Sequence, residues 1–344
     1  MIATRRRLGI VTSAAILILL LVISPVRGVL AVDLKAGDIV VGDGSAKTIF
    51  RVDKSTGVQT VISSGGSFGY PIGVAVEASG GILVADANAQ AIFRVDPATG
   101  TQALLTSVGN LDYPLGIAIE ADGSILVAEA GGTGCGPTSG VIRVHPTSGA
   151  QSPLSTGGNF TCAHAVAVEA DGNILVAEYT AAKLVRVHPV TGAQTVLSSG
   201  GNFVRPTGVA VEANGNILLV DSESFGGGGG VIRIDPVSGV QTVLSSAGTF
   251  SDPYHVAIDA TGQIYVADHE ANGGGGAVIR VDPVTGAQTI VSSLGSFVDP
   301  FGIAVVPGAG VFIPTLSVTG SVGFGLLLAI VAWTVIRRQR WQAR

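Results

Sequence analysis

One pattern recurs along most of this chain, and it restricts the possible folds more than any other feature. An acidic residue ends the first apolar run of each unit at Glu77, Glu120, Glu169, Glu212 and Asp259, in steps of 43, 49, 43 and 47 residues. Each unit contains four short apolar segments separated by turn residues. Repeats of this length with four strands each are typical of β-propeller blades.

The segments within a unit have the composition that such strands need. Val74–Val76 and Ile82–Ala85 are continuously apolar, which suits strands that pack against neighbouring blades on both faces. The pair Asp122-Gly123 supplies the positive φ of a tight hairpin between the first two strands. Asp235-Pro236-Val237-Ser238-Gly239 has the residues of a turn between the third and fourth strands. With 50 glycines and only 12% charged residues, the composition favours short strands and tight turns over helices or disorder.

The two ends of the repeat region complement one another. Residues 38–62 contain only the last three strands of a unit, whereas Asp299–Val305 supplies only the first. Joining them completes a sixth blade and leaves no open edge in the ring. The sequence therefore predicts an all-β fold, a six-bladed propeller over residues 32–307, closed by its N-terminal strands and its C-terminal strand.

The repeat resembles the NHL family and its relatives in the streptogramin lyase and gluconolactonase-like superfamily. The similarity is plainest in Pro206–Glu212, which reads Pro-Thr-Gly-Val-Ala-Val-Glu, and in Gly262–Asp268, which reads Gly-Gln-Ile-Tyr-Val-Ala-Asp. The resemblance implies the propeller fold. It leaves the activity open, because such propellers include binding platforms, lactonase-like metalloenzymes and lyases.

The charge of the body excludes one class of partner. All 24 acidic residues lie between Asp33 and Asp299, and residues 33–310 contain only eleven Lys and Arg, which leaves that segment at −13. A body this acidic repels phosphate backbones, so we expect no binding to nucleic acid. Cations are better candidate ligands.

The N-terminus has the pattern of an export signal. Arg5, Arg6 and Arg7 precede an apolar run from Leu8 to Ile23, and Val29-Leu30-Ala31 offers a cleavage site. We predict a signal peptide over residues 1–31, read by the export machinery. A permanent N-terminal anchor is the alternative, and both the Sec and the twin-arginine routes stay open.

The C-terminal tail, residues 308–344, has the pattern of a membrane anchor. Residues 311–336 carry no charge and are followed at once by Arg337 and Arg338, which predicts a transmembrane helix at 318–336 with its basic end in the cytoplasm. The run Ile313, Pro314, Thr315, Leu316 followed by this segment resembles the IPTL-CTERM sorting tail. That resemblance implies a Gram-negative bacterium and an exosortase-like enzyme that recognises the tail. The body would then lie in the periplasm, on the outer surface or outside the cell.

Insertions and cysteines collect on one predicted face, where the second strand of each blade ends. Three glycine-rich insertions fall there, at residues 130–140, 222–230 and 270–276. Cys135 lies in the first of them, and Cys162 lies in the link between two neighbouring blades. In an oxidising, exported setting we predict a Cys135–Cys162 disulfide, with two free thiols as the alternative.

Two histidines are the catalytic candidates. His255 takes the place of the glycine that opens the innermost strand in four other blades, and His164 lies beside Ala165, which replaces the same glycine. A histidine facing the channel mouth could act as a general base or a metal ligand. The alternative is a hydrogen-bonded histidine lining a structural channel. His145 and His188 replace the Asp of a turn on the opposite face, which favours a structural role.

A carboxylate ends the second strand of every blade. Asp43, Asp86, Glu129, Glu178, Asp221 and Asp268 form this set, and the last four are the candidate ligands of a divalent metal, Ca²⁺ or Mg²⁺. Because the position is acidic in all six blades, a structural role within each blade is the alternative reading.

Two classes of function follow. The first is an exported, envelope-anchored or cell-surface propeller that acts as a binding module for a protein or glycan ligand. The second is implied by the resemblance: a lyase or lactonase-like hydrolase with a divalent metal at the channel mouth. Aromatic residues make up only 5% of the chain, a small supply for a substrate pocket, which favours binding over catalysis.

Overall fold

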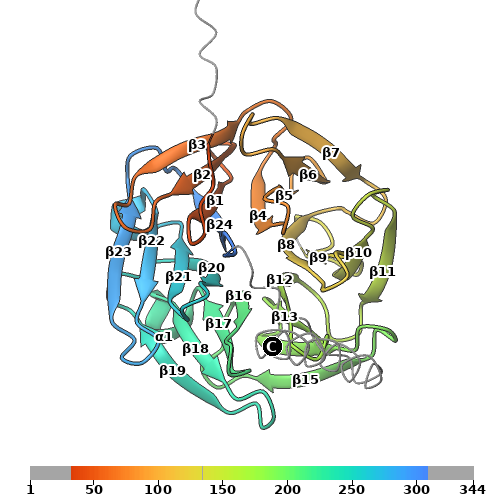
Figure 1. Cartoon of the computed structure of the whole chain (residues 1–344). Helices are drawn as coiled ribbons and strands as arrows, with labels where there is room; N and C mark the ends of the chain where they lie inside the picture. Colours follow the sequence, from red (N-terminus) through yellow and green to blue (C-terminus); the bar gives the residue numbers. More distant parts are fainter. Residues whose placement is uncertain (1–31, 134, 309–344) are drawn as a thin grey trace, which may run out of the picture.

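The computed structural model describes residues 32–133 and 135–308. In this region 24 strands form six four-stranded sheets that surround a central axis as blades (Figure 1). The predicted all-β, six-bladed propeller is confirmed. The export signal, the transmembrane helix and the sorting motif predicted from the sequence lie outside the described residues. Within those residues, none of the helices is long and apolar enough to cross a bilayer.

Five blades are continuous in sequence and are numbered in chain order. Blade 1 contains β4 (Pro71–Val76), β5 (Ile82–Asp86), β6 (Ala91–Val95) and β7 (Gln102–Ser107). Blade 2 contains β8 (Pro114–Ile119), β9 (Ile125–Glu129), β10 (Gly140–Val144) and β11 (Gln151–Thr156). Blade 3 contains β12 (Ala163–Val168), β13 (Ile174–Glu178), β14 (Lys183–Val187) and β15 (Gln194–Ser199).

The remaining blades complete the ring. Blade 4 contains β16 (Pro206–Val211), β17 (Ile217–Asp221), β18 (Gly230–Ile234) and β19 (Gln241–Ser246), with the short helix α1 (Ser224–Gly227) before β18. Blade 5 contains β20 (Pro253–Ile258), β21 (Ile264–Asp268), β22 (Ala277–Val281) and β23 (Gln288–Ser293), with α2 (Ala271–Gly274) before β22. Blade 6 contains β24 (Pro300–Val305), β1 (Ile39–Asp43), β2 (Thr48–Val52) and β3 (Gln59–Ser64).

The propeller has two faces, which we name by the strand ends they contain. The innermost strand of each blade begins, and the second strand ends, on the mouth face. The hairpin between those two strands and the turn between the third and fourth strands lie on the opposite, base face. Gly123 in one such hairpin has a φ of 88°, as the Asp-Gly pair predicts.

Blade 6 closes the ring with strands from both ends of the described chain. β24 pairs antiparallel with β1, with Val41 opposite Ile303 and Ile39 opposite Val305. Two backbone hydrogen bonds extend the pairing, from the Gly37 N–H to the Val306 carbonyl (2.9 Å) and from the Val306 N–H to the Asp38 carbonyl (2.8 Å). The complementary half-repeats at the two ends therefore do form one blade.

The core lies between blades. Every residue of each second strand is buried, which explains why these strands lack the alternation of a half-exposed sheet. One cluster joins blade 6 to blade 1, where Val40 and Ile49 pack with Ile82, Val84 and Val95. Comparable clusters fill the other interfaces, so each blade buries both of its faces against its neighbours.

The repeated arginine of the third strand ties each of blades 1 to 4 to the next blade. Arg94 donates to both carboxylate oxygens of Glu77 (2.8 and 2.7 Å) and to the Pro146 carbonyl of blade 2 (2.9 Å). Three further arginines make the same contacts with a glutamate of their own blade and a proline carbonyl of the next: Arg143, Arg186 and Arg233. At the seam between blades 5 and 6, Lys54 instead reaches Asp259 (3.1 Å).

Glycines allow the innermost strands to approach one another closely around the axis. A Cβ at Gly73 would overlap the carbonyl oxygen of Leu115 in the next blade, and one at Gly302 would overlap that of Ile72. These overlaps involve backbone atoms, which no rotamer change can relieve. Only blades 3 and 5 carry a larger residue at this position, Ala165 and His255, and both side chains are buried.

The close approach of the strands predicts the effect of adding one methyl group. We expect Gly73→Ala to lower the free energy of unfolding by about 1–3 kcal/mol, because the strand must move away from the Leu115 carbonyl. Gly228→Ala is the matched control, since a Cβ there would have no atom closer than 3.7 Å. Urea denaturation of both variants measures the difference. Equal stability of the two variants would contradict the packing described above.

Candidate functional site

Side chains from the innermost strands close the channel at the mouth face. Ile72, Leu115, Thr207 and Phe301 each follow the first residue of their strand, and all are buried. Below them a cavity of about 50 Å³ remains on the axis, lined by the backbone of Gly73 and Gly116 and by His255, among others. The centre of the propeller is therefore a packed floor, and a ligand of ordinary size would have to bind above it.

His164, one of the two catalytic candidates, lies within this floor. It is 5% exposed, its ring stacks on Tyr179 with centroids 4.8 Å apart, and its Nε2 forms a hydrogen bond with Tyr254 Oη (3.2 Å). Its Nδ1 has no hydrogen-bond partner among the described residues. Burial, together with the nearby His255, lowers the pKa of His164 to about 3, so its imidazole is neutral at pH 7.

His255, the other candidate, lies deeper. It is 8% exposed, and it lines the small axial cavity, where its Nε2 has no hydrogen-bond partner in the described chain. Burial lowers its pKa to about 4. The structure thus places the two histidines near one another, but beneath the tyrosines of the floor and in the neutral form.

The four predicted metal ligands are bound to the backbone of their own blades. Glu129 is fully buried and accepts N–H groups from Asp112 (3.1 Å), Tyr113 (2.7 Å) and Gly131 (2.9 Å). The equivalent carboxylates are also fully buried and accept backbone N–H groups on either side of the second strand: Glu178, Asp221 and Asp268. This arrangement supports the structural reading, since each carboxylate organises the loops of its own blade.

The two cysteines form a disulfide, as predicted. Cys135 and Cys162 are joined with their Cα atoms 4.8 Å apart. The bond ties the glycine-rich insertion of blade 2 to the start of blade 3, beside Tyr113 and Tyr179 of the mouth. On the base face, His145 and His188 each accept backbone N–H groups of their turns at Nδ1, which is the role that Asp has in the other blades.

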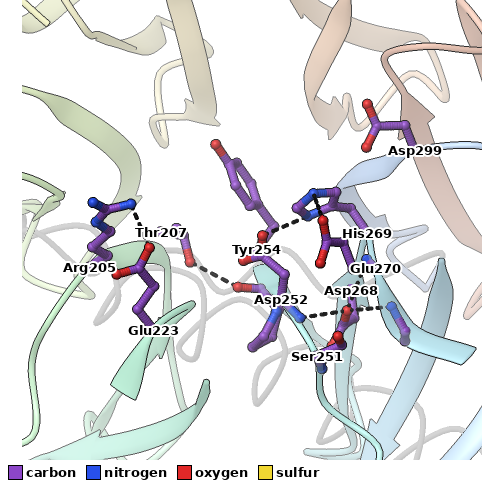
Figure 2. A network of polar contacts seen from close by, with 12 residues as sticks. Arg205, Thr207, Glu223, Ser251, Asp252, Tyr254, Asp268, His269, Glu270 and Asp299 are labelled. Carbon is purple, nitrogen blue, oxygen red and sulfur yellow. Dashed lines mark hydrogen bonds and ion pairs between the residues drawn. The ribbon is translucent and has the colours of Figure 1, made fainter. Parts of the chain in front are cut away.

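The structure also shows a cluster that the sequence analysis did not single out. Asp252, His269 and Glu270 of blade 5 lie together on the mouth face (Figure 2), with one ligand atom from each within 4.8 Å of the others. His269 Nδ1 is 3.2 Å from Asp252 Oδ2, yet the two are not aligned as a hydrogen bond, and this buried nitrogen has no other partner among the described residues. His269 also stacks on Phe301, with centroids 4.9 Å apart.

A column-by-column comparison of the repeats would have revealed this cluster. Asp252 holds the position before the strand-opening proline, where Tyr70 and Tyr113 stand in blades 1 and 2. His269 follows the buried carboxylate, where blades 1 and 2 have alanine. These two positions adjoin in every blade and vary from blade to blade, and only blade 5 pairs a carboxylate with an imidazole there, which is the signal. It was missed because the repeats were compared by their apolar and turn residues.

The surroundings of Asp252 are strongly acidic. Burial raises the pKa of Asp252, the charges of Asp268, Glu270 and Glu223 raise it further, and His269 opposes them. A positive charge bound here would therefore be stabilised by several carboxylates.

An ion pair lies on the other side of Tyr254. Arg205 pairs with Glu223 (2.5 Å), donates to Tyr179 Oη (2.9 Å) and has its guanidinium carbon 5.2 Å from the Tyr179 ring centroid. Tyr254 lies between this pair and the His269–Glu270 side (Figure 2). Toward blade 1, Asp299 accepts hydrogen bonds from Tyr70 Oη (2.7 Å) and Ser45 Oγ (2.8 Å).

The mouth face is therefore divided. Blades 4 and 5 contribute charged groups, and an apolar cluster extends from Tyr70, Ala87, Tyr113 and Ala130 of blades 1 and 2, past the disulfide, to Tyr179, Tyr254 and Phe301 beside those charges. This arrangement can bind a ligand with a charged part and an apolar part. The imidazole and the two carboxylates of the blade 5 cluster can also exchange protons, or they can coordinate a cation through their nitrogen and oxygen atoms.

Acidification tests the burial of the two floor histidines. Their pKa values in the folded state, about 3 and about 4, lie below the ordinary 6.5, so the unfolded state binds more protons and the free energy of unfolding falls as the pH drops from about 6.5 toward 4. His255→Phe should reduce this pH dependence in urea denaturation. A His255→Phe protein with the full pH dependence would show that His255 is not buried in the neutral form.

Comparisons with known proteins agree with this architecture. Residues 31–246 match the family model described as "SMP-30/Gluconolactonase/LRE-like region". No curated protein matches the chain in sequence.

Three solved structures illustrate the similarity of fold. The chain resembles a propeller in a nidogen/laminin complex (15% identity, 79% of this chain and 99% of that chain, TM-score 0.64). It also resembles a streptogramin B lyase (14% identity, 80% and 89%, TM-score 0.57). A third is a catalytically inactive virginiamycin B lyase from Staphylococcus aureus with quinupristin (15% identity, 76% and 86%, TM-score 0.55). These identities are too low to indicate more than a shared fold.

The family match spans well over half of the chain, and it falls on the repeats that form blades 1 to 4 and the N-terminal strands of blade 6. The gluconolactonase-like relationship that the repeat pattern implied is thereby confirmed. The chain belongs to the SMP-30/gluconolactonase/LRE-like family of β-propellers.

Proposed function

We propose that this propeller is an exported binding module whose mouth face binds a cationic group that carries an apolar neighbour, as on a lysine- or arginine-bearing segment of a protein partner. The observation that carries the proposal is the divided mouth. Asp252, Glu270 and Glu223 gather negative charge on one side, and tyrosines offer apolar and aromatic surface on the other. Aromatic faces beside carboxylates favour organic cations over anions.

The partial burial of Asp252 strengthens the preference, whereas Glu270 and Glu223 are exposed. Asp252 and His269 are 29% and 19% exposed in their side chains, so a bound cation would be screened less by salt than on an open surface. The packed floor keeps such a ligand at the surface and gives it no channel to enter. A shallow, divided surface of this kind suits recognition of a side chain or a short segment.

Sequence and disulfide support the proposed address. The signal pattern at residues 1–31 and the tail at 308–344 would export the body across the inner membrane of a Gram-negative bacterium and hold it at the membrane, at least until an exosortase-like enzyme processes the tail. The Cys135–Cys162 disulfide fits an oxidising compartment outside the cytoplasm.

Peptide binding provides the test of the proposed function. A fluorescent peptide of alternating lysine and leucine should bind the purified protein, and the counterpart with glutamate in place of lysine should not. The double variant Asp252→Asn, Glu270→Gln should weaken binding about tenfold, because two close charge contacts of about 0.7 kcal/mol each are lost. Asp122→Asn, Asp171→Asn removes the same charge from the base face. If both double variants weakened peptide binding equally, the net charge of the protein would explain the effect, and a binding site on the mouth face would be refuted.

A second candidate function is a metal-assisted lyase or hydrolase, and the blade 5 cluster favours it. The residues fit a divalent cation: one imidazole and two carboxylates supply nitrogen and oxygen ligands, and the buried His269 Nδ1 lacks an aligned partner among the described residues. Asp252, His269 and Glu270 would hold the ion. When bound, it would polarise a substrate carbonyl or activate a water. Tyr254, between this cluster and Arg205, would orient the substrate, and Arg205 and Glu223 would border it.

Metal binding separates the two candidates. If the second holds, calorimetric titration with Mg²⁺, Ca²⁺, Mn²⁺ and Zn²⁺ should detect one site that His269→Ala removes and His188→Ala does not. Two reactions should then require His269. One is hydrolysis of gluconolactone, which the family description suggests, and the other is cleavage of quinupristin, the compound in one of the similar structures. A protein that binds no divalent cation and leaves both compounds intact would exclude this candidate.

A further inference from the structure

The described chain enters and leaves the propeller on the same face. β1 starts and β24 ends on the base face. There the Gly37 N–H donates a hydrogen bond to the Val306 carbonyl oxygen, at an N–O distance of 2.9 Å. Residues 32–38 and 306–308 therefore adjoin one another on this side of the ring. The mouth face, with the blade 5 cluster, is at the other end of the axis.

The base face also carries the three most exposed large apolar side chains of the described residues. Val190, Val237 and Val284 are 82%, 90% and 86% exposed, and they hold the same position in the turns of blades 3, 4 and 5. The same position in the other blades is filled by small or polar residues: Ser55, Ala98 and Thr147. These three most exposed valines thus lie in three adjacent blades of one face.

We propose that the base face lies against a lipid bilayer, with the valine turns of blades 3 to 5 in its interfacial region and the mouth face pointing away from it. The inference rests on the membrane-anchored address proposed above. The transmembrane helix predicted at 318–336 begins ten residues after Gly308, which is about 30–35 Å of extended chain, so a bilayer that held it would lie nearer to the base face than to the mouth face. Because the connection leaves from the base face, turning the mouth toward the membrane would require it to pass along the whole side of the ring.

Charge selects the kind of lipid. The turns between the third and fourth strands also carry Asp235 and Asp282 beside two of the valines, and Asp53 and Asp96 in blades 6 and 1, and these carboxylates would be repelled by anionic headgroups. The proposal therefore commits to zwitterionic lipid, in which apolar side chains enter the interface without opposing electrostatics. The opposite face would stay accessible to a ligand in solution, as the proposed binding role requires.

Site-specific quenching tests the orientation in the full chain. The protein would be reconstituted into phosphatidylcholine vesicles that carry a nitroxide on the headgroup, with an environment-sensitive fluorophore attached at Val237→Cys or, as the mouth-face control, at Asn88→Cys. The native disulfide is kept intact during labelling. We expect fluorescence at least about twofold lower with the nitroxide lipid for the label at position 237, and no change at position 88.

Three results would overturn the proposal, and they can be told apart. Quenching at position 88 alone would show the opposite orientation. No quenching at either position in protein that floats with the vesicles would show a body held away from the bilayer, with the anchor intact. Protein that does not float with the vesicles would refute the anchor and, with it, the orientation. Replacing all three valines with serine should reduce quenching of a label at Ala98→Cys, whereas the same change should leave flotation unaffected.

Discussion

The antiparallel pairing of β24 with β1 joins the two ends of the described chain within one sheet. Its hydrogen bonds hold blade 6 together and bring blade 5 against blade 6, where Lys54 reaches Asp259 and Gln59 reaches the Leu294 carbonyl (2.8 Å). A ring can press its innermost strands together only when it is closed. The glycines that face neighbouring carbonyls, the packed floor and the small axial cavity all follow from that closure.

The closed ring is nearly regular, and its irregularities carry the chemistry. Residues that recur in every blade, such as Arg94 and Glu129, satisfy the backbone or the next blade. Blade 5 alone pairs a carboxylate with an imidazole at two adjoining, variable positions, Asp252 and His269, and there the mouth gains a cluster of charges without full internal compensation. A regular scaffold that holds one irregular site is a common way for a fold to support different functions in different relatives.

Much of this fold follows from the sequence because its signals are local and repeated. The apolar runs and the Asp-Gly hairpins specify strands and turns locally, and the partial units at residues 38–62 and Asp299–Val305 complement one another, which predicts ring closure. The helical turns α1 and α2 escaped prediction because Phe225 and Asn272 adopt a positive φ within glycine-rich segments that read as loops. The disulfide was predictable because both cysteines fall on adjoining loops of one face.

The site was harder to predict, for physical reasons. Position alone placed His164 and His255 at the channel, but the burial of His164 depends on Tyr179 and Tyr254, which come from other strands and loops. Asp252 and His269 are 17 residues apart, and their proximity depends on the pairing of β20 with β21. For the carboxylates that end the second strands, the sequence left both a metal site and a structural role open, and the structure shows them bonded to the loops of their own blades.

Hydrogen exchange of the closing strands is the most direct test of this account. If β24 and β1 close the ring, the amides of Val41 and Ile303 should exchange only through the same global unfolding as that of Val176, which lies in the second strand of blade 3. Their opening free energies should then agree and change together with denaturant. Exchange at Val41 and Ile303 through a separate, lower-energy opening would show that blade 6 is not an integral part of the ring.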